Sequence, residues 1–387
     1  MSTSAWRVAF VAALVAVTGC RAVSPDGELL RRSWEGYRAR FVTADGRVVR
    51  PEHGGDTVSE GQAYTLLRAA WMDDQATFDR VWLWTRARLT RTGREGASLL
   101  AWHWSPQDGG HVVDWNVATD ADADVALALL MAEDRWHAPS VAGLPRYGGS
   151  ARAMLSDLAD HAVAADDSLV PFLLPGVWAD QRAEGRGLVL NPSYLAPASY
   201  RLFYRATGDE RWSRLAASAY DVLEAVCAAA GSSGAVPDWV RWWSSDRWSP
   251  EGADGGRSSW DAVRVPWRVA TDLVWFGEAR AGTFLSRCLE PYVRRHLNAG
   301  QGLAVERSLT GGVLGADDHP LANAMFAFAL SEPRERDRLL GRVQGQLVTG
   351  SDGLFFGDAD RYYVNSLAYL PYLARAGRYL PPIVLSR

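Results

Sequence analysis

The chain has 387 residues, 48% of them apolar, and a formal net charge of −4, so it is long enough and apolar enough for a large hydrophobic core. This weakly acidic balance offers no basic surface, and we expect no nucleic-acid partner. All 41 basic residues are Arg, which excludes chemistry that depends on a lysine, such as Schiff-base formation.

Residues 1–20 have the pattern of a targeting segment. Arg7 precedes the apolar run VAFVAALVAV, and the segment ends in VTGC at Cys20. The run is too short to span a membrane, and the small residues at its end indicate cleavage. VTGC resembles a bacterial lipobox, in which Cys20 becomes the lipidated N-terminus. The alternative is an ordinary secretory signal followed by an unmodified cysteine. Both predict an extracytoplasmic protein, attached to a membrane only through a lipid on Cys20.

From residue 25 onward the chain is predicted to form helix after helix, because apolar residues recur every three or four positions and sustained alternation is scarce. Runs such as VALALLMA and MFAFALS are apolar on several faces, as expected of helices inside a larger assembly. Residues 25–387 contain no linker and are predicted to form one domain, with a long polar loop at 244–259. The clearest predicted helices are 60–71, 76–90, 122–132, 150–164, 193–204, 211–230, 261–280, 320–330 and 362–376.

The cysteines and histidines give no indication of a metal site. Cys227 and Cys288 each lie in an apolar helical segment. This placement favours buried thiols over a disulfide, although the sequence leaves their pairing open. His and Cys residues are not clustered, so no metal or other cofactor is expected.

Three alternating aspartates occur in ATDADADVALALL, residues 118–130. A calcium-binding EF-hand loop needs Gly at its sixth position and Glu at its twelfth. Counted from Asp120, those positions are Val125 and Met131. The segment therefore does not match a calcium loop.

The same aspartates are better explained by a helix start. A helix N-terminus favours negative charge, but one cap requires one aspartate, and Asp120 and Asp124 at (i, i+4) repel each other. This excess charge indicates a polar function for Asp120. Asp122 and Asp124 are expected mainly to cap and solvate the start of the helix.

Two further carboxylates lie at predicted helix starts. Glu60 begins a strongly apolar helix and has no cation nearby, whereas Asp261 follows the polar loop and precedes Arg264 by three residues. On a helix, Arg264 shares a face with Asp261 and is expected to lower its pKa. A solvated glutamate and a surface ion pair are the simpler alternatives. Trp260 and Trp267 flank the pair, which favours a half-buried site.

These carboxylates fit the requirements of glycoside hydrolysis, which needs a protonated acid and an ionised base on either side of a sugar-binding cleft. The difference in their surroundings assigns Glu60 as the acid and Asp261 as the base. The chain also has 18 Trp, whose faces stack on sugar rings as well as packing in cores.

Four segments resemble glycoside hydrolase family 8, and they occur in the family's order. They are SEGQAYTLL, ATDADADVALALLMAEDRW, LNPSYLAPASYRLF and WDAVRVPWRVATD. The resemblance extends from Trp34 to YYVNSLAYL and so covers nearly the whole mature chain. Val125 stands where Ile or Met is more usual, and Leu127 stands where an aromatic residue often occurs. Both are packing positions.

The resemblance implies an all-α, single-domain (α/α)6 toroid whose inner helix ends form a groove for a β-1,4-linked glycan. It also implies endo-acting hydrolysis with inversion, in which Glu60 protonates the leaving oxygen and Asp261 activates a water. Asp120 is implied to bind sugar hydroxyls at the cleavage subsite, and Tyr194 to lie near the base and the water. Arg264 is implied to hold the base ionised.

Within the family the substrates are cellulose, mixed-linkage glucan, xylan and chitosan. The motifs look closest to cellulases associated with bacterial cellulose synthesis, so we expect an endo-1,4-β-glucanase that acts as a monomer. A chitosanase would need more acidic residues along the groove, for which Asp108 and Asp114 are candidates. Trp82, Trp84 and Trp275 are expected in the core. The expected stacking platforms are Trp102, Trp104, Trp115, Trp178, Trp239 and Trp260.

Two other classes of function stay open from the sequence. A polysaccharide lyase on a similar helical toroid would need Tyr, His and Arg near an acidic sugar, but the seven His residues are scattered. A non-catalytic glycan-binding lipoprotein would keep the aromatic residues but tolerate loss of Glu60 or Asp261. Both carboxylates are present.

Overall fold

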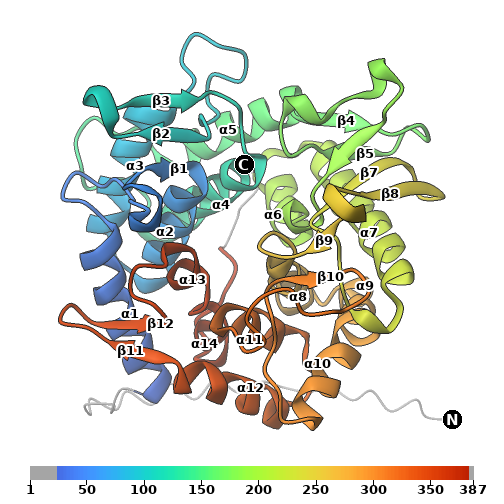
Figure 1. Ribbon diagram of the computed structural model, residues 1–387. Helices are drawn as coiled ribbons and strands as arrows, with labels where there is room; N and C mark the ends of the chain where they lie inside the picture. The colour runs from blue at the N-terminus through green and yellow to red at the C-terminus, as the bar shows by residue number, and fades with distance from the viewer. Residues whose placement is uncertain (1–23, 383–387) are drawn as a thin grey trace, which may run out of the picture.

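The computed structural model describes residues 24–382, which form a closed ring of inner and outer helices (Figure 1). Each inner helix contacts the next, and α13 contacts α2 to close the ring. The inner helices are α2 (Ser59–Met72), α4 (Thr119–Trp136), α6 (Pro197–Thr207), α8 (Val265–Phe276), α11 (Pro320–Phe326) and α13 (Tyr362–Leu367). The predicted all-α (α/α)6 toroid is confirmed.

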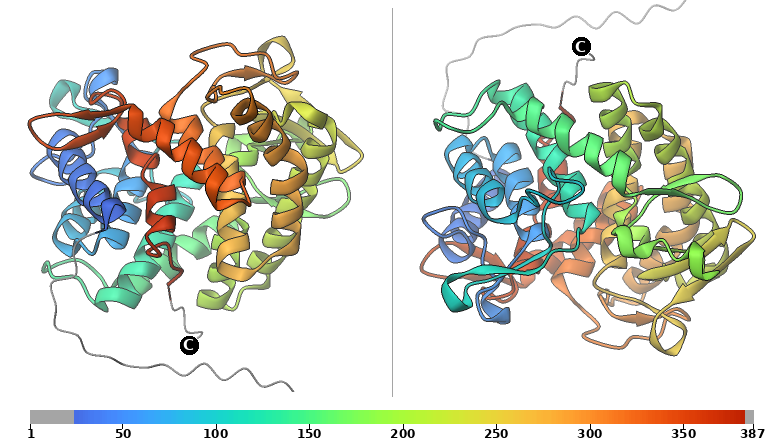
Figure 2. Two further views of the ribbon diagram at one scale, coloured as in Figure 1. Left: turned by 90° about the horizontal axis from the view of Figure 1, so that it is seen from below. Right: turned by 90° about the horizontal axis from the view of Figure 1, so that it is seen from above.

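The outer helices alternate with the inner ones along the chain. Figure 2 shows the N-terminal helix beside the C-terminal segments, where the two ends of the ring meet. The outer layer consists of α1 (Pro25–Phe41), α3 (Gln75–Leu89), α5 (Tyr147–His161), α7 (Glu210–Ala230), α9 (Ala279–Phe284) with α10 (Glu290–Asn298), and α12 (Pro333–Gly345), while α14 (Leu370–Arg375) packs against α1 and α11.

Burial differs between the two layers in the way the apolar pattern predicts. In α4 every residue of 119–132 is buried, because neighbours surround this inner helix. In the outer helix α7, Leu215, Ala219, Val222 and Val226 are buried at spacings of three and four, so one face packs inward. The core therefore lies between the layers and inside the inner ring.

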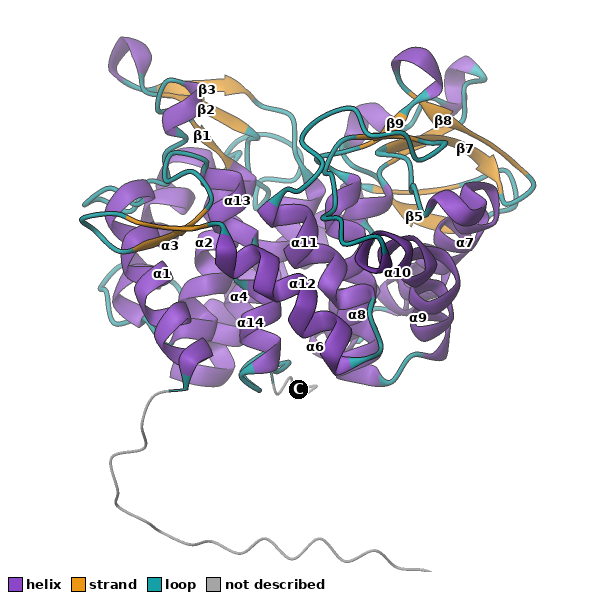
Figure 3. Ribbon diagram, turned by 60° about the horizontal axis from the view of Figure 1, so that its bottom comes forward, coloured by secondary structure: helices purple, strands orange, loops and turns teal. Residues whose placement is uncertain are grey.

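Short antiparallel sheets lie mainly at one end of the helical ring (Figure 3), and one hairpin packs along its side against α1. One joins β1 (Thr57–Val58), β2 (His103–Ser105) and β3 (His111–Asp114). Another joins β6 (Leu188–Leu190), β7 (Trp239–Ser244) and β8 (Arg247–Glu251). The remaining pairs are β9 (Arg257–Ser258) with β10 (Arg307–Ser308), β4 (Val163–Ala165) with β5 (Pro171–Leu173), and β11 (Leu347–Thr349) with β12 (Leu354–Phe356).

Some predicted boundaries were wrong. The segment 244–259 is not an irregular loop, because it contains β8 and β9. The predicted helix 261–280 ends at Phe276, where Gly277 takes a left-handed φ of 68° and caps α8. The predicted helix 193–204 begins only at Pro197, because Asn191 caps a separate 3₁₀ turn, Pro192–Tyr194. The predicted helix 362–376 consists of α13 and α14.

The predicted targeting segment and Cys20 lie outside the described residues. Within residues 24–382, none of the helices combines the length and apolar character needed to cross a membrane.

Candidate active site

Glu60 and Asp261 line the same cavity, which has a volume of about 560 Å³. Glu60 is the second residue of α2, and Asp261 immediately precedes the 3₁₀ turn that leads into α8. Alternation of inner and outer helices makes the inner helices run in one direction, so their N-termini gather at one end of the ring. The lining residues are Arg50, Glu52, His53, Val58, Glu60, Tyr64, Trp102, Trp260, Asp261, Arg264, His319, Arg361, Tyr362, Tyr363 and Val364.

The Glu60 carboxyl is half-buried and favours the protonated form. Burial raises its pKa to about 7, and the negative charge of Asp120 acts in the same direction. Trp102 Nε1 donates a hydrogen bond to Oε1 at 3.2 Å, and Ser59 Oγ donates to Oε2 at 3.3 Å. A carboxyl with a pKa near neutrality carries a proton that it can donate.

The Asp261 carboxylate has an arginine as its direct partner. Arg264 Nη2 donates to Asp261 Oδ1 at 2.7 Å, and the aspartate side chain is 31% exposed. Burial nevertheless raises the pKa of Asp261 above its usual value, and the Arg264 charge only opposes this rise. The expected net lowering of the pKa was therefore wrong, because desolvation outweighs the arginine.

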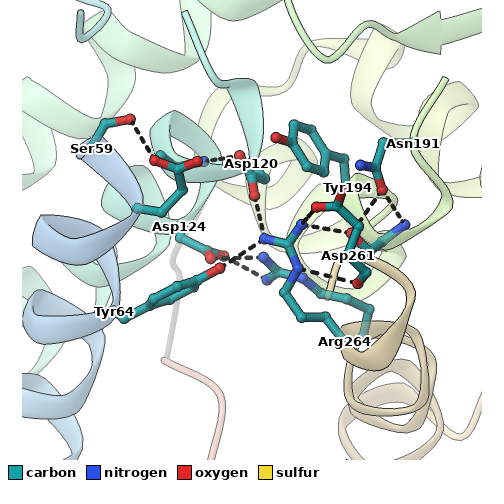
Figure 4. Close-up of polar contacts among 12 residues, drawn as sticks. Ser59, Tyr64, Asp120, Asp124, Asn191, Tyr194, Asp261 and Arg264 are labelled. Carbon is teal, nitrogen blue, oxygen red and sulfur yellow. Dashed lines mark hydrogen bonds and ion pairs between the residues drawn. The ribbon is translucent and has the colours of Figure 1, made fainter. Parts of the chain in front are cut away.

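Arg264 connects four side chains, of which Tyr64 and Asp261 line the cavity (Figure 4). Its Nη1 donates to Tyr64 OH at 2.8 Å and to Asp120 Oδ2 at 2.6 Å. Its Nη2 donates to Ser193 Oγ at 2.7 Å as well as to Asp261. The guanidinium is 3% exposed, so the alternative of a surface ion pair is wrong.

The three aspartates at the start of α4 are all buried. Asp124 accepts two hydrogen bonds from Arg268, at 2.6 and 2.7 Å, and Asp122 Oδ1 accepts one from the Leu100 backbone N–H at 2.9 Å. Burial raises the pKa of Asp122 well above its usual value. The expectation that Asp122 and Asp124 solvate the helix start was wrong, because α4 begins inside the ring.

Four of the six tryptophans expected to stack on sugars form two groups. Trp102 and Trp260 line the cavity and are 37% and 40% exposed. Trp178 is exposed and lies 5.9 Å from Trp239, centroid to centroid, and Trp239 lies 5.9 Å from Tyr194. These last three rings form a row that leads away from Arg264, whose guanidinium lies over Tyr194 at 5.2 Å.

Trp104 is not available to a ligand. Its ring is buried, with Trp84 at 5.4 Å on an edge and the Arg47 guanidinium at 4.9 Å. The prediction of a stacking role for Trp104 was wrong, because β2 turns this side chain toward the core. Trp115 is exposed and is covered on one face by Arg94 at 4.3 Å.

Trp82 and Trp84 are buried as predicted, and Trp275 is partly buried against the core. Asp108 and Asp114 belong to the β2–β3 hairpin and do not line the cavity.

Several residues of the site were not predicted from the sequence. Tyr64 follows Glu60 by one helical turn, a spacing that places both on one face of α2. Tyr363 OH donates to the Trp260 carbonyl at 2.8 Å. Asn191 is buried, and its side chain lowers the pKa of Asp261.

The described part of the chain contains no cluster of three or more His, Cys, Asp or Glu side chains arranged to hold a metal ion.

Comparison with known proteins gives matches over nearly the whole chain. The family model "Glycosyl hydrolases family 8" matches residues 1–375. Endoglucanase A of Acetivibrio thermocellus is 30% identical over 374 residues, which span 92% of this chain and 70% of that protein.

Two solved structures share the fold. Endo-β-1,4-glucanase CMCax from Acetobacter xylinum has a TM-score of 0.71 at 25% identity, over 91% of this chain and 99% of that one. The β-1,3-1,4-glucanase from Paenibacillus sp. X4 has a TM-score of 0.76 at 21% identity, over 93% and 94% of the two chains.

Proposed function

The chain belongs to glycosyl hydrolases family 8, and from this premise we propose that it is an inverting endo-β-1,4-glucanase with Glu60 as general acid and Asp261 as general base. The observation that carries the proposal is the pair of unlike carboxyls in one cavity. Glu60 has a pKa of about 7, whereas Asp261 accepts a hydrogen bond from a buried arginine.

In the proposed reaction the glycan lies between the two carboxyls. Glu60 donates its proton to the glycosidic oxygen as the bond to the anomeric carbon breaks. Asp261 removes a proton from a water that attacks that carbon from the opposite face, which inverts its configuration. Arg264 positions Asp261 and disperses its charge through a direct hydrogen bond.

The neighbouring residues are proposed to bind the sugar. Asp120, fixed by Arg264 and adjacent to Glu60, contacts hydroxyls of the ring at the cleavage subsite, and Tyr194 lies by the attacking water. Aromatic rings that are exposed or partly buried supply the proposed stacking surfaces. These are the exposed Trp102, Trp115, Trp178 and Trp260 and the partly buried Trp239.

The choice of β-1,4-glucan rests on the relatives, among them Endoglucanase A and an endo-β-1,4-glucanase. A mixed-linkage β-glucan is the second candidate, because the Paenibacillus structure is a β-1,3-1,4-glucanase. The proposed location is outside the cytoplasm, with a lipid on Cys20 as the proposed membrane anchor and a monomer as the active form.

The test compares four polymers and three variants of the mature chain. Reducing ends are measured from carboxymethylcellulose, mixed-linkage β-glucan, xylan and chitosan. Glu60→Gln is expected to lower kcat on the preferred glucan by roughly 10²–10⁴-fold, because a general acid typically contributes that much. Asp261→Asn is expected to lower kcat over a similar range, because the water then has no base.

Glu184→Gln is the matched control. Glu184 is an exposed carboxylate paired with Arg186 on the surface, and its loss is expected to leave kcat unchanged. Solution viscosity that falls early relative to reducing ends establishes endo cleavage. Full activity in Glu60→Gln would refute the acid assignment, and higher activity on xylan or chitosan than on both glucans would refute the substrate class.

A further inference from the structure

The two cysteines within the described residues lie on neighbouring outer elements of the ring. Cys227 is near the C-terminal end of α7, and Cys288 belongs to the π-helical turn Leu285–Leu289 between α9 and α10. The helix α7 contacts both α9 and this turn. Figures 1 and 3 show α7, α9 and α10 side by side at one edge of the ring.

The segments that carry these two thiols are in contact. The interaction with Cys288 is the first cause that lowers the pKa of Cys227, and the same interaction raises the pKa of Cys288. Both are free thiols, with Cys288 buried and Cys227 half-buried against the core. A disulfide bond of about 2.05 Å requires the Cα atoms of its cysteines to lie within about 7 Å of each other, a separation that contacting segments permit.

The backbone around the pair is closely packed. Gly234, just beyond α7, has a left-handed φ of 59°, and a Cβ built there would lie 2.8 Å from Tyr292 Cβ and 3.0 Å from the Cys288 carbonyl oxygen. The chain that leaves α7 therefore lies directly against the π-helical turn. This packing fixes the distance between the two cysteine-bearing segments.

We propose that Cys227 and Cys288 form a disulfide bond that joins α7 to the π-helical turn when the chain meets a disulfide-bearing oxidant such as a thiol–disulfide oxidoreductase. The Cys227 thiolate attacks one sulfur of the oxidant, and the other sulfur leaves as a thiolate. The Cys288 thiolate then attacks the Cys227 sulfur of the mixed disulfide and releases the second thiolate. The two cysteines lose two electrons and two protons, and the oxidant is reduced to two thiols.

The order of attack follows from the surroundings of the thiols. Cys227 is the half-buried and more acidic thiol, with Arg287 nearby to stabilise its thiolate. Cys288 is 1% exposed, so an external disulfide reaches it only after Cys227 has reacted. Cys227 is therefore the attacking thiol and Cys288 the resolving one.

The bond restrains the segment that leads to Asp261. Arg307 donates to the carbonyls of Ser233 and Gly234, each at 3.4 Å, and to Ser258 Oγ at 3.2 Å. The carboxylate of Asp238 then accepts from the N–H groups of Ser259, at 2.7 Å, and Ala262, at 2.9 Å. A link from α7 to the π-helical turn thus stiffens the wall of the cavity.

The experiment uses the full chain, first reduced and then incubated with oxidised glutathione. Free thiols are counted in denaturant, and peptides are mapped without reduction. The expected result is the loss of the Cys227 and Cys288 thiols and one cross-linked peptide that contains both residues. The closed loop is about 60 residues long, so the melting temperature is expected to rise by about 5 °C and to fall again with dithiothreitol.

Single variants test the order of attack. Cys288→Ser is expected to accumulate a glutathione adduct on Cys227, whereas Cys227→Ser is expected to leave Cys288 unmodified, and neither gains thermal stability on oxidation. Two thiols that stay free, separate adducts on both cysteines, or a bond that includes Cys20 would overturn the proposal. None of these readouts depends on glycan hydrolysis.

Discussion

Among single residues, Arg264 joins two carboxylates of the proposed site. One guanidinium donates to both Asp120 and Asp261, and its positive charge also opposes the rise in the pKa of Glu60. Asp120 acts in the opposite direction on Glu60 through its negative charge. The protonation of the proposed acid therefore depends on a balance between two neighbours that are themselves paired.

This balance predicts a pH profile. Glu60 must carry a proton, and its pKa is about 7, so kcat/KM is expected to fall as the pH rises through about 7. Asp120→Asn removes a charge that raises this pKa, so the alkaline limb is expected to move to lower pH. The measurement is kcat/KM from pH 4 to 9 for both forms. A limb that stays in place or moves to higher pH would contradict the proposed coupling.

Two tryptophans allow a matched comparison of exposed and buried rings. Trp178→Ala is expected to raise KM for the polymer several-fold with little change in stability, because Trp178 is exposed in the aromatic row. Trp104→Ala is expected to lower the free energy of unfolding by about 3–5 kcal/mol, because a buried ring leaves a cavity. Urea unfolding and polymer kinetics on each variant separate the two roles, and an unchanged KM for Trp178→Ala would remove it from the binding surface.

Pairs of elements are joined by charges across the inner ring. Asp120 and Asp124 on α4 are four residues apart, and so are Arg264 and Arg268. Asp120 pairs with Arg264, and Asp124 pairs with Arg268. Because each aspartate has its own arginine partner, the repulsion expected between Asp120 and Asp124 from their spacing is offset. Both ion pairs are almost fully buried, so an unpaired member is costly.

A double-mutant cycle tests the buried ion pair between Asp124 and Arg268. Asp124→Leu and Arg268→Met are each expected to lower the free energy of unfolding by about 3–5 kcal/mol, because each leaves a buried charge without its partner. The double variant is expected to cost clearly less than the sum, since no charge is left unpaired. Urea unfolding of the four proteins gives the coupling free energy. Additive costs would show that the pair does not act as a unit.

For the whole molecule, the closure of the ring depends on the C-terminal helices. Arg68 on α2 donates to the Asn365 carbonyl at 2.9 Å and to Ser33 Oγ on α1 at 2.8 Å, so one side chain ties both ends of the chain to the ring. Tyr37 OH bonds Ser366 Oγ at 3.1 Å across the same junction. The first and last helices therefore stabilise each other.

Removal of the C-terminal helices is expected to prevent folding. A chain that ends at residue 358 lacks α13 and α14, whose large apolar side chains are buried. Each such side chain contributes roughly 1.5–3 kcal/mol, and several together exceed the total stability typical of a protein. Near-ultraviolet circular dichroism and urea unfolding should show no cooperative transition. A shortened chain with a native-like transition would show that ring closure is dispensable.

The sequence by itself determined the helical architecture, the family and the location of two unlike carboxyls at helix starts. These features are encoded locally, in the three- and four-residue apolar spacing and in short motifs around Glu60 and Asp261. The leader and its Cys20 stay predictions, because they lie outside the described residues. The role of each site residue also stays a prediction until the variants are measured.

The tertiary structure decided which of these residues meet and how they are charged. Asp120 and Arg264 are 144 positions apart, as are Asp124 and Arg268, so no local pattern reveals that they pair across the ring. The burial of Asp122 and Trp104, and the raised pKa of Asp261, arise from surrounding helices and strands that are distant in sequence. Desolvation depends on the assembled ring. It raises the pKa of Asp261, whereas the spacing of Asp261 and Arg264 in the sequence predicted that this pKa would be lowered.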